Sequence, residues 1–359
     1  MNARWDPTGT IPVREAHAFD VSRLESYLSN TLPDAADGLR VQQFKGGQSN
    51  PTYLLETPKN QYVLRRKPPG VLLPSAHAVD REFRIISALY GSAVPVPKPI
   101  CYCADESVVG TPFFLMEYVT GRIFWSAELA DLTPRERHDA YDEMNRVIAA
   151  IHTIDPDAVG LGDFGKREHY VARQIDRWSR QFRASETEHI EAMEQLIEWL
   201  PRHVPPEEPC RIAHGDFRID NLIFDAHELR IRAVIDWELA TLGNALSDLA
   251  YHCMPWRMPH ELRKGLEGLD LAALGIPGEA EYVGRYCERT GRASIPAFDF
   301  YIAFNLFRLA SILQGVAARA RAGNASSLHA AQTGRLTRPV AELGWEQAQR
   351  AERERRAAS

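Results

Sequence analysis

The sequence predicts an α+β fold of two lobes, a small β-rich lobe followed by a larger helical one. In residues 39–66, short runs rich in Val, Tyr and Thr alternate between apolar and polar side chains, as half-buried strands do. Beyond Thr120-Gly121, apolar side chains recur at helical spacing in several long segments. We therefore expect an N-lobe over residues 1–118 and a C-lobe over residues 119–359.

The N-lobe is expected to hold a helix at its start, an antiparallel sheet and one helix packed on the sheet. Helical periodicity covers residues 17–30, where Asp20 or Ser22 can cap the first turn. Residues 76–90 predict the packed helix. Alternating runs predict the strands, over residues 39–44, 51–56, 61–66 and 111–119, with a Pro-rich extended segment at 94–100.

The C-lobe is expected to be helical apart from one strand pair within residues 210–236. Its helical segments are residues 133–153, 168–183, 187–200, 245–254, 278–290, 297–321 and 337–355. The tail from Gly344 is charged on all sides, so we expect a solvated helix end there.

Composition limits the classes of partner. A net charge of −6 argues against bulk nucleic-acid binding. Five cysteines, an odd number without a metal-site spacing, suit a reducing compartment better than a disulfide framework. The N-terminus lacks an apolar signal core, and no apolar run approaches the ~20 residues of a membrane span. We expect a cytoplasmic protein that binds neither nucleic acid nor membrane, and the oligomeric state stays open.

The stretch AHGDFRIDNLIF, residues 213–224, places three polar side chains on a turn before a buried strand: His214, Asp216 and Asn221. Phosphoryl transfer needs a carboxylate to receive the proton of the attacking hydroxyl, and oxygen ligands for Mg²⁺. His-x-Asp-x-x-x-x-Asn has the spacing of the protein-kinase catalytic loop, with Gly215 where those enzymes carry Arg. Taken alone, the stretch could also be a polar Asx turn.

Two further clusters fit the same chemistry. Asp236 follows a buried strand in AVIDWELATLG, where it could share a metal ion with Asn221, and Glu238 could assist it. Gly46-Gly47 lies in the hairpin FKGGQSNPTYLLE, and successive amide groups of such a turn can bind an anion. The alternative interpretation of Asp236 is a strand-end cap, and that of Gly46-Gly47 is an ordinary hairpin turn. The order of the three clusters along the chain is that of a kinase.

These motifs resemble the aminoglycoside phosphotransferase and choline-kinase-like family of small-molecule kinases, from about residue 38 to 340. The matching text is His214-Gly215-Asp216 with Asn221, Ile235-Asp236-Trp237-Glu238, and Gly243 through Asp248-Leu249-Ala250. FKGGQSNPTY, YVLRRKPPGVLLPSAHAVDREFRI and DWELATLG look most like the kinase-like domains related to those fused to acyl-CoA dehydrogenases. We expect no dehydrogenase domain within these 359 residues.

The resemblance implies a protein-kinase-like two-lobe fold, ATP and Mg²⁺ as cofactors, and a role for each matching residue. Asp216 would be the catalytic base, and Asn221 and Asp236 would bind Mg²⁺. Glu82 would brace the basic residue of the third strand. The remaining positions would bind ATP: Gly47, Ser49 and Asn50 over the phosphates, and Glu117 and Val119 as the adenine hinge. Asp248 would anchor the catalytic loop, and His214 would be structural.

The sequence departs from the family at that basic residue. In YVLRRKPP the position that usually holds Lys is taken by Arg65, with Arg66 and Lys67 as competing candidates. A guanidinium can hold phosphates in a bidentate manner, so the departure is compatible with activity.

The acceptor is expected to be a hydroxylated small molecule. Segments expected to line its pocket are mixed or basic: Arg173, Arg177, Trp178, Arg180, Trp256, Arg257, Asn305 and Arg308. Arg173, Arg177 and Arg180 share one helix face, which is either solvated or specific for an anion such as a hydroxyacyl-CoA. The alternatives are an aminoglycoside- or sugar-type kinase and a catalytically silent nucleotide-binding protein. The choice between ATP and GTP, and between one and two metal ions, stays open.

Overall fold

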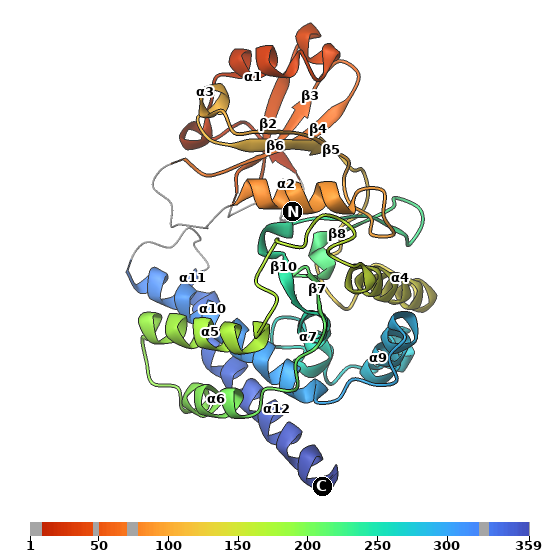
Figure 1. The fold of residues 1–359 in the computed structure, drawn as a ribbon, viewed down its shortest axis with the longest axis vertical. Helices are drawn as coiled ribbons and strands as arrows, with labels where there is room; N and C mark the ends of the chain where they lie inside the picture. Colours follow the sequence, from red (N-terminus) through yellow and green to blue (C-terminus); the bar gives the residue numbers. More distant parts are fainter. Residues whose placement is uncertain (1–8, 46–49, 70–77, 323–329, 359) are drawn as a thin grey trace, which may run out of the picture. The chain divides into compact units, whose positions relative to one another are not determined.

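The computed structural model describes residues 9–45, 50–69, 78–322 and 330–358 (Figure 1). The chain divides into two compact units. The first comprises residues 1–122, 223–226 and 232–238, and the second comprises residues 123–222, 227–231 and 239–359. The first unit thus takes in two segments from far along the chain, and the second of these segments carries Asp236 and Glu238.

The first unit is built on a six-stranded antiparallel sheet in the order β1-β2-β3-β4-β6-β5. The strands are β1 (Thr10–Ile11), β2 (Arg40–Phe44), β3 (Thr52–Glu56), β4 (Gln61–Arg66), β5 (Pro99–Cys103) and β6 (Phe113–Glu117). Its helices are α1 (Val21–Leu28), α2 (Val79–Leu89) and α3 (Glu106–Val109), with 3-10 turns at Glu15–His17 and Pro33–Asp37.

The two faces of this sheet are covered by different helices. Leu24 and Leu28 of α1 are fully buried in one cluster with Tyr53, Leu64 and other apolar side chains of the sheet. Helix α2 lies against β5 and β6 (Figure 1). Because successive side chains of a strand point to opposite faces, β4 directs its two arginines to different surroundings.

The second unit is mainly helical, with a short β-ladder in which β7 (Cys210–Ala213) pairs with β10 (Thr241–Asn244). Its helices are α4 (Pro134–Thr153), α5 (Tyr170–Ser185), α6 (Glu191–Arg202), α7 (Ala245–Cys253), α8 (Leu271–Leu274), α9 (Glu279–Thr290), α10 (Phe298–Arg321), α11 (Ala330–Gly334) and α12 (Thr337–Ala358). Further 3-10 turns lie at Ile219–Asn221, Trp237–Leu239 and Met254–Arg257.

Helix α10 is the core helix of the second unit, and α5, α7, α11 and α12 pack against it. By length and composition α10 could cross a membrane, which corrects the expectation that no apolar run is long enough. However, 83% of its most apolar window is buried inside the protein, as in the core helix of a globular domain.

Most expected elements have a counterpart in the described residues. The single strand pair expected within residues 210–236 is wrong, because β7 pairs with β10 while β8 (Leu222–Phe224) pairs with β9 (Ile231–Val234). The packed helix begins at Val79 rather than residue 76, and residues 76 and 77 lie outside the described part. The charged tail is helical to Ala358.

Candidate active site

The predicted site residues divide between the two units. Asp216 and Asn221 belong to the second unit. The first unit contains the others that the structure describes: Asn50, Arg65, Glu82, Glu117, Val119 and Asp236. Gly47 and Ser49 fall in residues 46–49, outside the described part.

The turn that carries Asp216 needs a glycine before it. Strand β7 ends at Ala213, and Gly215 adopts a φ of +81°. A Cβ at this position would lie 2.7 Å from the carbonyl oxygen of Leu239, so a side chain would both clash and strain the backbone. The space around Gly215 therefore explains why no arginine stands before the acid of this loop.

Asp248 on α7 anchors this turn, as the sequence predicted. Its Oδ2 accepts the backbone N–H of His214 at 2.8 Å, and its Oδ1 accepts that of Gly215 at 2.9 Å. Burial alone would raise the pKa of Asp248, but the neighbouring His152 and His214 and the N–H of Gly215 hold the pKa below its usual range. An ionised Asp248 therefore holds the loop rigid. His214 is structural, since its Nδ1 accepts the backbone N–H of Asp216 at 3.2 Å.

The carboxylate of Asp216 is held by three side chains. Tyr251 donates its hydroxyl to Oδ1 at 2.5 Å, and Arg218 forms an ion pair with the same oxygen at 3.0 Å. Asn221 donates Nδ2 to Oδ2 at 3.1 Å and to the Asp216 carbonyl oxygen at 2.9 Å. The carboxylate is thus fixed in one orientation while 18% of the side chain stays exposed.

Asn221 keeps one group free for a ligand. With Nδ2 bound to Asp216, its Oδ1 has no hydrogen-bond partner among the described residues. An amide oxygen is a common ligand of hard cations. The donor chemistry of Asn221 therefore fits the metal role that the resemblance implies.

The first unit surrounds Arg65 with carboxylates. Its Nη1 lies 2.8 Å from Oε1 of Glu82, and its Nη2 donates to Oδ1 of Asp236 at 3.1 Å. Glu238 lies 3.9 Å from Nη2 and accepts the side-chain amide of Asn50 at 3.4 Å. Arg65 is 7% and Glu82 1% exposed, so the pair is nearly isolated from water.

The register of β4 distinguishes the three basic candidates. Arg66 points to the other face, where it donates to the Tyr53 hydroxyl at 3.0 Å and to backbone carbonyls of His17 and Val109. Lys67 lies past the end of the strand. Arg65 is therefore the basic residue paired with Glu82, the position at which the family usually has Lys.

Burial and charge shape this cluster together. Desolvation raises the pKa of Glu82, and the charge of Arg65 opposes the rise. Asp236 adopts a φ of +64°, which is strained for a residue other than glycine. Its Oδ2 has no partner among the described residues, and 34% of its side chain is exposed. This oxygen is available to coordinate a cation.

The predicted hinge, which includes Glu117 and Val119, begins at the end of β6. The backbone N–H of Glu117 is occupied, because it donates to the Lys98 carbonyl at 2.9 Å. Tyr118 donates to the carbonyl of Gln61 at 3.3 Å. The N–H and C=O of Val119 have no hydrogen-bond partner within the described ranges, which leaves both available to a ligand.

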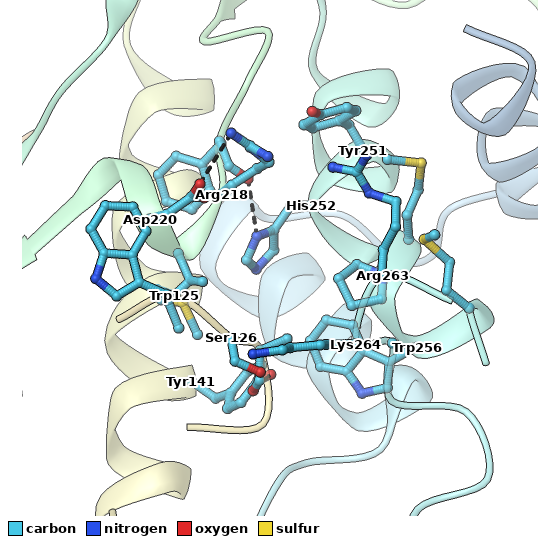
Figure 2. A pocket seen from close by; sticks show the side chains of 18 of the residues that line it. Trp125, Ser126, Tyr141, Arg218, Asp220, Tyr251, His252, Trp256, Arg263 and Lys264 are labelled. Carbon is cyan, nitrogen blue, oxygen red and sulfur yellow. Dashed lines mark hydrogen bonds and ion pairs between the residues drawn. The ribbon is translucent and has the colours of Figure 1, made fainter. Parts of the chain in front are cut away.

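A cavity of about 300 Å³ opens within the second unit (Figure 2). Arg218 and Tyr251, which hold Asp216, are part of its wall. Most of the remaining wall is aromatic, Met or basic: Trp125, Tyr141, Met144, Phe217, His252, Met254, Trp256, Met258, Arg263 and Lys264, with Asp220. The cavity therefore lies beside the carboxylate that we predicted to be the base.

Sequence reasoning missed several of these residues. Of the expected pocket segments only Trp256 lines the cavity, whereas Arg173, Arg177 and Arg180 are absent from its wall. Tyr251 could have been found, since it lies three residues after Asp248 and so shares a helix face with that anchor. Nothing in the sequence pointed to Arg263 or Lys264.

Comparison with known proteins identifies the relatives of this chain. The model of the phosphotransferase enzyme family matches residues 40–298. Acyl-CoA dehydrogenase family member 10 of Mus musculus is 46% identical over 340 residues, covering 94% of this chain and 32% of the mouse protein. Acyl-CoA dehydrogenase family member 11 of Rattus norvegicus is 41% identical over 343 residues, covering 93% of this chain and 44% of the rat protein. The chain thus spans less than half the length of these relatives.

Solved structures show the same fold. A protein of Ralstonia eutropha, provisionally named an aminoglycoside phosphotransferase, is 49% identical with a TM-score of 0.85, over 93% of this chain and 99% of the other. A thermostable mutant of aminoglycoside phosphotransferase APH(4)-Ia, in a ternary complex with AMP-PNP and hygromycin B, is 16% identical with a TM-score of 0.60, over 91% and 98%. The predicted α+β, protein-kinase-like fold is confirmed.

Proposed function

Because the chain belongs to the phosphotransferase enzyme family, we propose that it transfers the γ-phosphoryl group of ATP to a hydroxyl group of a small molecule. One observation carries this proposal: the Asp216 carboxylate is fixed by Tyr251, Arg218 and Asn221 beside a cavity of about 300 Å³. Tyr251 and Arg218, two of the side chains that hold this carboxylate, line the cavity. Hydroxyl activation requires a carboxylate close to the bound acceptor.

In the proposed reaction, the acceptor oxygen attacks the γ-phosphorus while the bond between this phosphorus and the bridging oxygen of ADP breaks. The hydroxyl proton passes to the carboxylate of Asp216. The fixed orientation of this carboxylate would supply positioning, which accounts for much of the catalysis in phosphoryl transfer.

Mg²⁺ would be held by Asn221 and Asp236, each of which keeps an oxygen without a partner in the described part of the chain. When bound, Mg²⁺ would neutralise charge on the phosphates. Asp236 would offer Oδ2 to the cation while Oδ1 keeps its hydrogen bond from Arg65. Glu82 would hold Arg65 in place.

For the nucleotide, we propose that Arg65 contacts the phosphates and that the loop containing Gly47, Ser49 and Asn50 covers them. Adenine would pair with the Glu117 carbonyl and with the free backbone groups of Val119, since the Glu117 N–H is occupied. AMP-PNP bound to the related aminoglycoside phosphotransferase supports a nucleotide of this kind.

The first acceptor class we propose is a hydroxyacyl-CoA, supported by the names of the acyl-CoA dehydrogenase relatives. The bound hygromycin B of the structural neighbour makes an aminoglycoside the second candidate. All five cysteines are free, which fits the reducing cytoplasm that we propose as the location.

Release of ADP from Mg²⁺-ATP tests the proposal against hydroxyacyl-CoAs, choline, sugars and aminoglycosides, with Asp216→Asn as the blank. Turnover with one class and none in the blank supports the kinase. ATP-dependent thermal stabilisation without turnover of any acceptor would instead support a silent nucleotide-binding protein.

A further inference from the structure

The turn Leu262–Gly265 places two adjacent basic residues in an unusual backbone conformation. The N–H of Gly265 donates to the Leu262 carbonyl at 3.2 Å, and the residues between them, Arg263 and Lys264, have φ values of 56° and 54°. Positive φ at both central positions is the geometry of turns that normally contain Asn or Gly. Local propensity therefore does not explain why this turn carries Arg and Lys.

Neighbouring contacts hold the turn in place. The N–H of Leu266 donates to the Pro255 carbonyl at 2.7 Å, and that of Glu267 donates to the Met258 carbonyl at 3.0 Å. A Cβ on Gly265 would lie 1.9 Å from the Met258 carbonyl oxygen, so the backbone approaches too closely for any other residue. Strained residues that are fixed in this way occur preferentially at ligand clamps.

The two side chains form no close ion pair within the described ranges, although the charge of Arg263 acts on the nearby carboxylate of Asp220. Neither Arg263 nor Lys264 forms a hydrogen bond or ion pair with any residue that the structure describes, and both are exposed. Asp220 is the carboxylate on the described cavity wall, and it pairs with Arg218 at 3.1 Å. In Figure 2, Lys264 extends across the pocket toward Ser126. An anion in the cavity would complete this arrangement.

The rest of the wall favours an apolar body. Trp125, Tyr141, Trp256 and three methionines line the cavity, and burial lowers the pKa of His252 to about 4, so this histidine is neutral near pH 7. A cavity of about 300 Å³ corresponds to the volume of roughly ten water molecules, which is enough for an acyl chain of medium length. A polycation would be repelled by the charges of Arg263 and Lys264.

We propose that this cavity binds the acceptor, and that Arg263 and Lys264 bind an anionic group on it, so that the acceptor is a hydroxylated organic anion with an apolar body. This inference rests on the proposed function and replaces the face of Arg173, Arg177 and Arg180 as the anion site. Two arginines of that face already have partners within the protein: Arg173 donates to the Lys166 carbonyl at 2.7 Å, and Arg180 pairs with Asp176 at 2.5 Å.

The test uses Arg263→Asn/Lys264→Gly, which removes both charges while supplying the residues that such a turn prefers. The probes are 3- and 4-hydroxydecanoyl-CoA, the two free acids, their uncharged methyl esters, and hygromycin B. Arg353→Gln, an exposed basic position on α12, is the matched control. ADP release gives kcat and KM, and calorimetric titration of the same probes without nucleotide gives Kd.

We expect the double variant to fold with an unchanged or higher Tm. Its KM and Kd for the anionic probes should rise at least about tenfold, while its kcat stays within about threefold and its KM for the methyl esters does not change. Wild-type preference for the free acids would assign the anion to a carboxylate, and preference for the thioesters would assign it to the CoA phosphates. Either preference, lost in the variant, supports the proposal.

Unchanged KM and Kd for all anionic probes in the double variant would overturn the inference. It would also be overturned if the wild type bound the free acids, the methyl esters and the CoA thioesters with equal affinity. If the wild type binds the anions and the variant does not, but no probe releases ADP, the inference stands and the phosphotransferase proposal fails. If wild type and variant turn over the anionic probes identically, the phosphotransferase proposal stands and the inference about Arg263 and Lys264 fails.

Discussion

The hydroxyl of Tyr251 donates a hydrogen bond of 2.5 Å to Oδ1 of Asp216. Tyr251 is itself held in place, because the guanidinium of Arg308 stacks on its ring, 5.1 Å from the centroid. Arg308 also donates to the carbonyl of Gly215 at 2.8 Å. The orientation of the proposed base is thus set from the core helix α10 as well as from its own loop.

Replacing Tyr251 with Phe should lower kcat about tenfold and leave KM for ATP and acceptor within about twofold, because the ring still packs while one donor to Asp216 is lost. Steady-state kinetics with the active acceptor measure this split. The control is Tyr90→Phe, at an exposed position. A rise in KM with unchanged kcat would assign Tyr251 to acceptor binding instead of positioning.

Replacing Asp216 with Asn should lower turnover by about 10²- to 10⁴-fold, because the amide cannot receive the acceptor's proton. Binding of Mg²⁺-ATP, measured by titration calorimetry, should stay within about threefold. Turnover at the wild-type rate would contradict the assignment of the base.

How much of this site could be predicted from the sequence depends on how local each interaction is. Asp216 and Asn221 are five residues apart on one turn, so their spacing predicts that they meet. Asp248 matched a motif and does anchor the loop. The identity of Arg65 as the partner of Glu82 required the register of β4, which alternation alone leaves uncertain between neighbouring residues.

The missed features are those formed by distant segments. Strand β10 is short and contains Gly243 and Asn244, which are poor strand formers, so its pairing with β7 had no local signal. The cationic turn at Arg263 and Lys264 reads as a charged surface loop, because positive φ at both residues cannot be inferred from their types.

Replacing Arg65 with Leu should destabilise the protein by about 3 kcal/mol, because it leaves Glu82 buried without its cation. Chemical denaturation measures the loss. The double variant Arg65→Leu/Glu82→Leu should recover most of the stability without recovering phosphotransfer. If the double variant is as unstable as the single one, the buried pair is not the reason for the loss.

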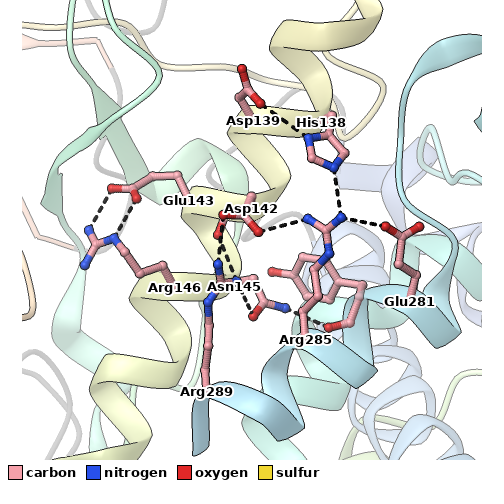
Figure 3. A network of polar contacts seen from close by, with 10 residues as sticks. His138, Asp139, Asp142, Glu143, Asn145, Arg146, Glu281, Arg285 and Arg289 are labelled. Atoms are coloured by element: carbon pink, nitrogen blue, oxygen red, sulfur yellow. Dashed lines mark hydrogen bonds and ion pairs between the residues drawn. The ribbon is translucent and has the colours of Figure 1, made fainter.

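Helices α4 and α9 are joined by a polar network that we expect to be stabilising (Figure 3). Asn145 is fully buried, donates to the Tyr282 carbonyl at 2.8 Å and accepts Nη1 of Arg289 at 2.8 Å. Asn145→Ala should therefore cost about 1–3 kcal/mol in unfolding free energy. Asp139→Ala, at an exposed position on the same helix, should cost less than about 1 kcal/mol. Equal losses for the two variants would contradict the role of the network.

His252 should make the stability of the protein depend on pH. It lies on the cavity wall in its neutral form, with Nδ1 facing the carbonyl of Phe217 at 3.3 Å and Nε2 facing the hydroxyl of Tyr282 at 2.8 Å. Burial lowers its pKa to about 4, well below its usual range, although the hydrogen bond to the Phe217 carbonyl and the nearby Asp248 oppose the shift. Protonation would place an N–H group where Tyr282 now donates.

Between about pH 6.5 and pH 4, the unfolded chain binds a proton at His252 that the folded chain does not bind. The stabilisation is therefore complete above pH 6.5 and is lost as the pH falls through this window, by about 2 kcal/mol between pH 7 and pH 5. Gln can donate and accept at the same two partners without ionising, so His252→Gln should show a pH dependence of unfolding smaller by that amount. Urea denaturation of both proteins at pH 7 and pH 5 measures the difference. Parallel losses in wild type and variant would show that other groups cause the acid sensitivity.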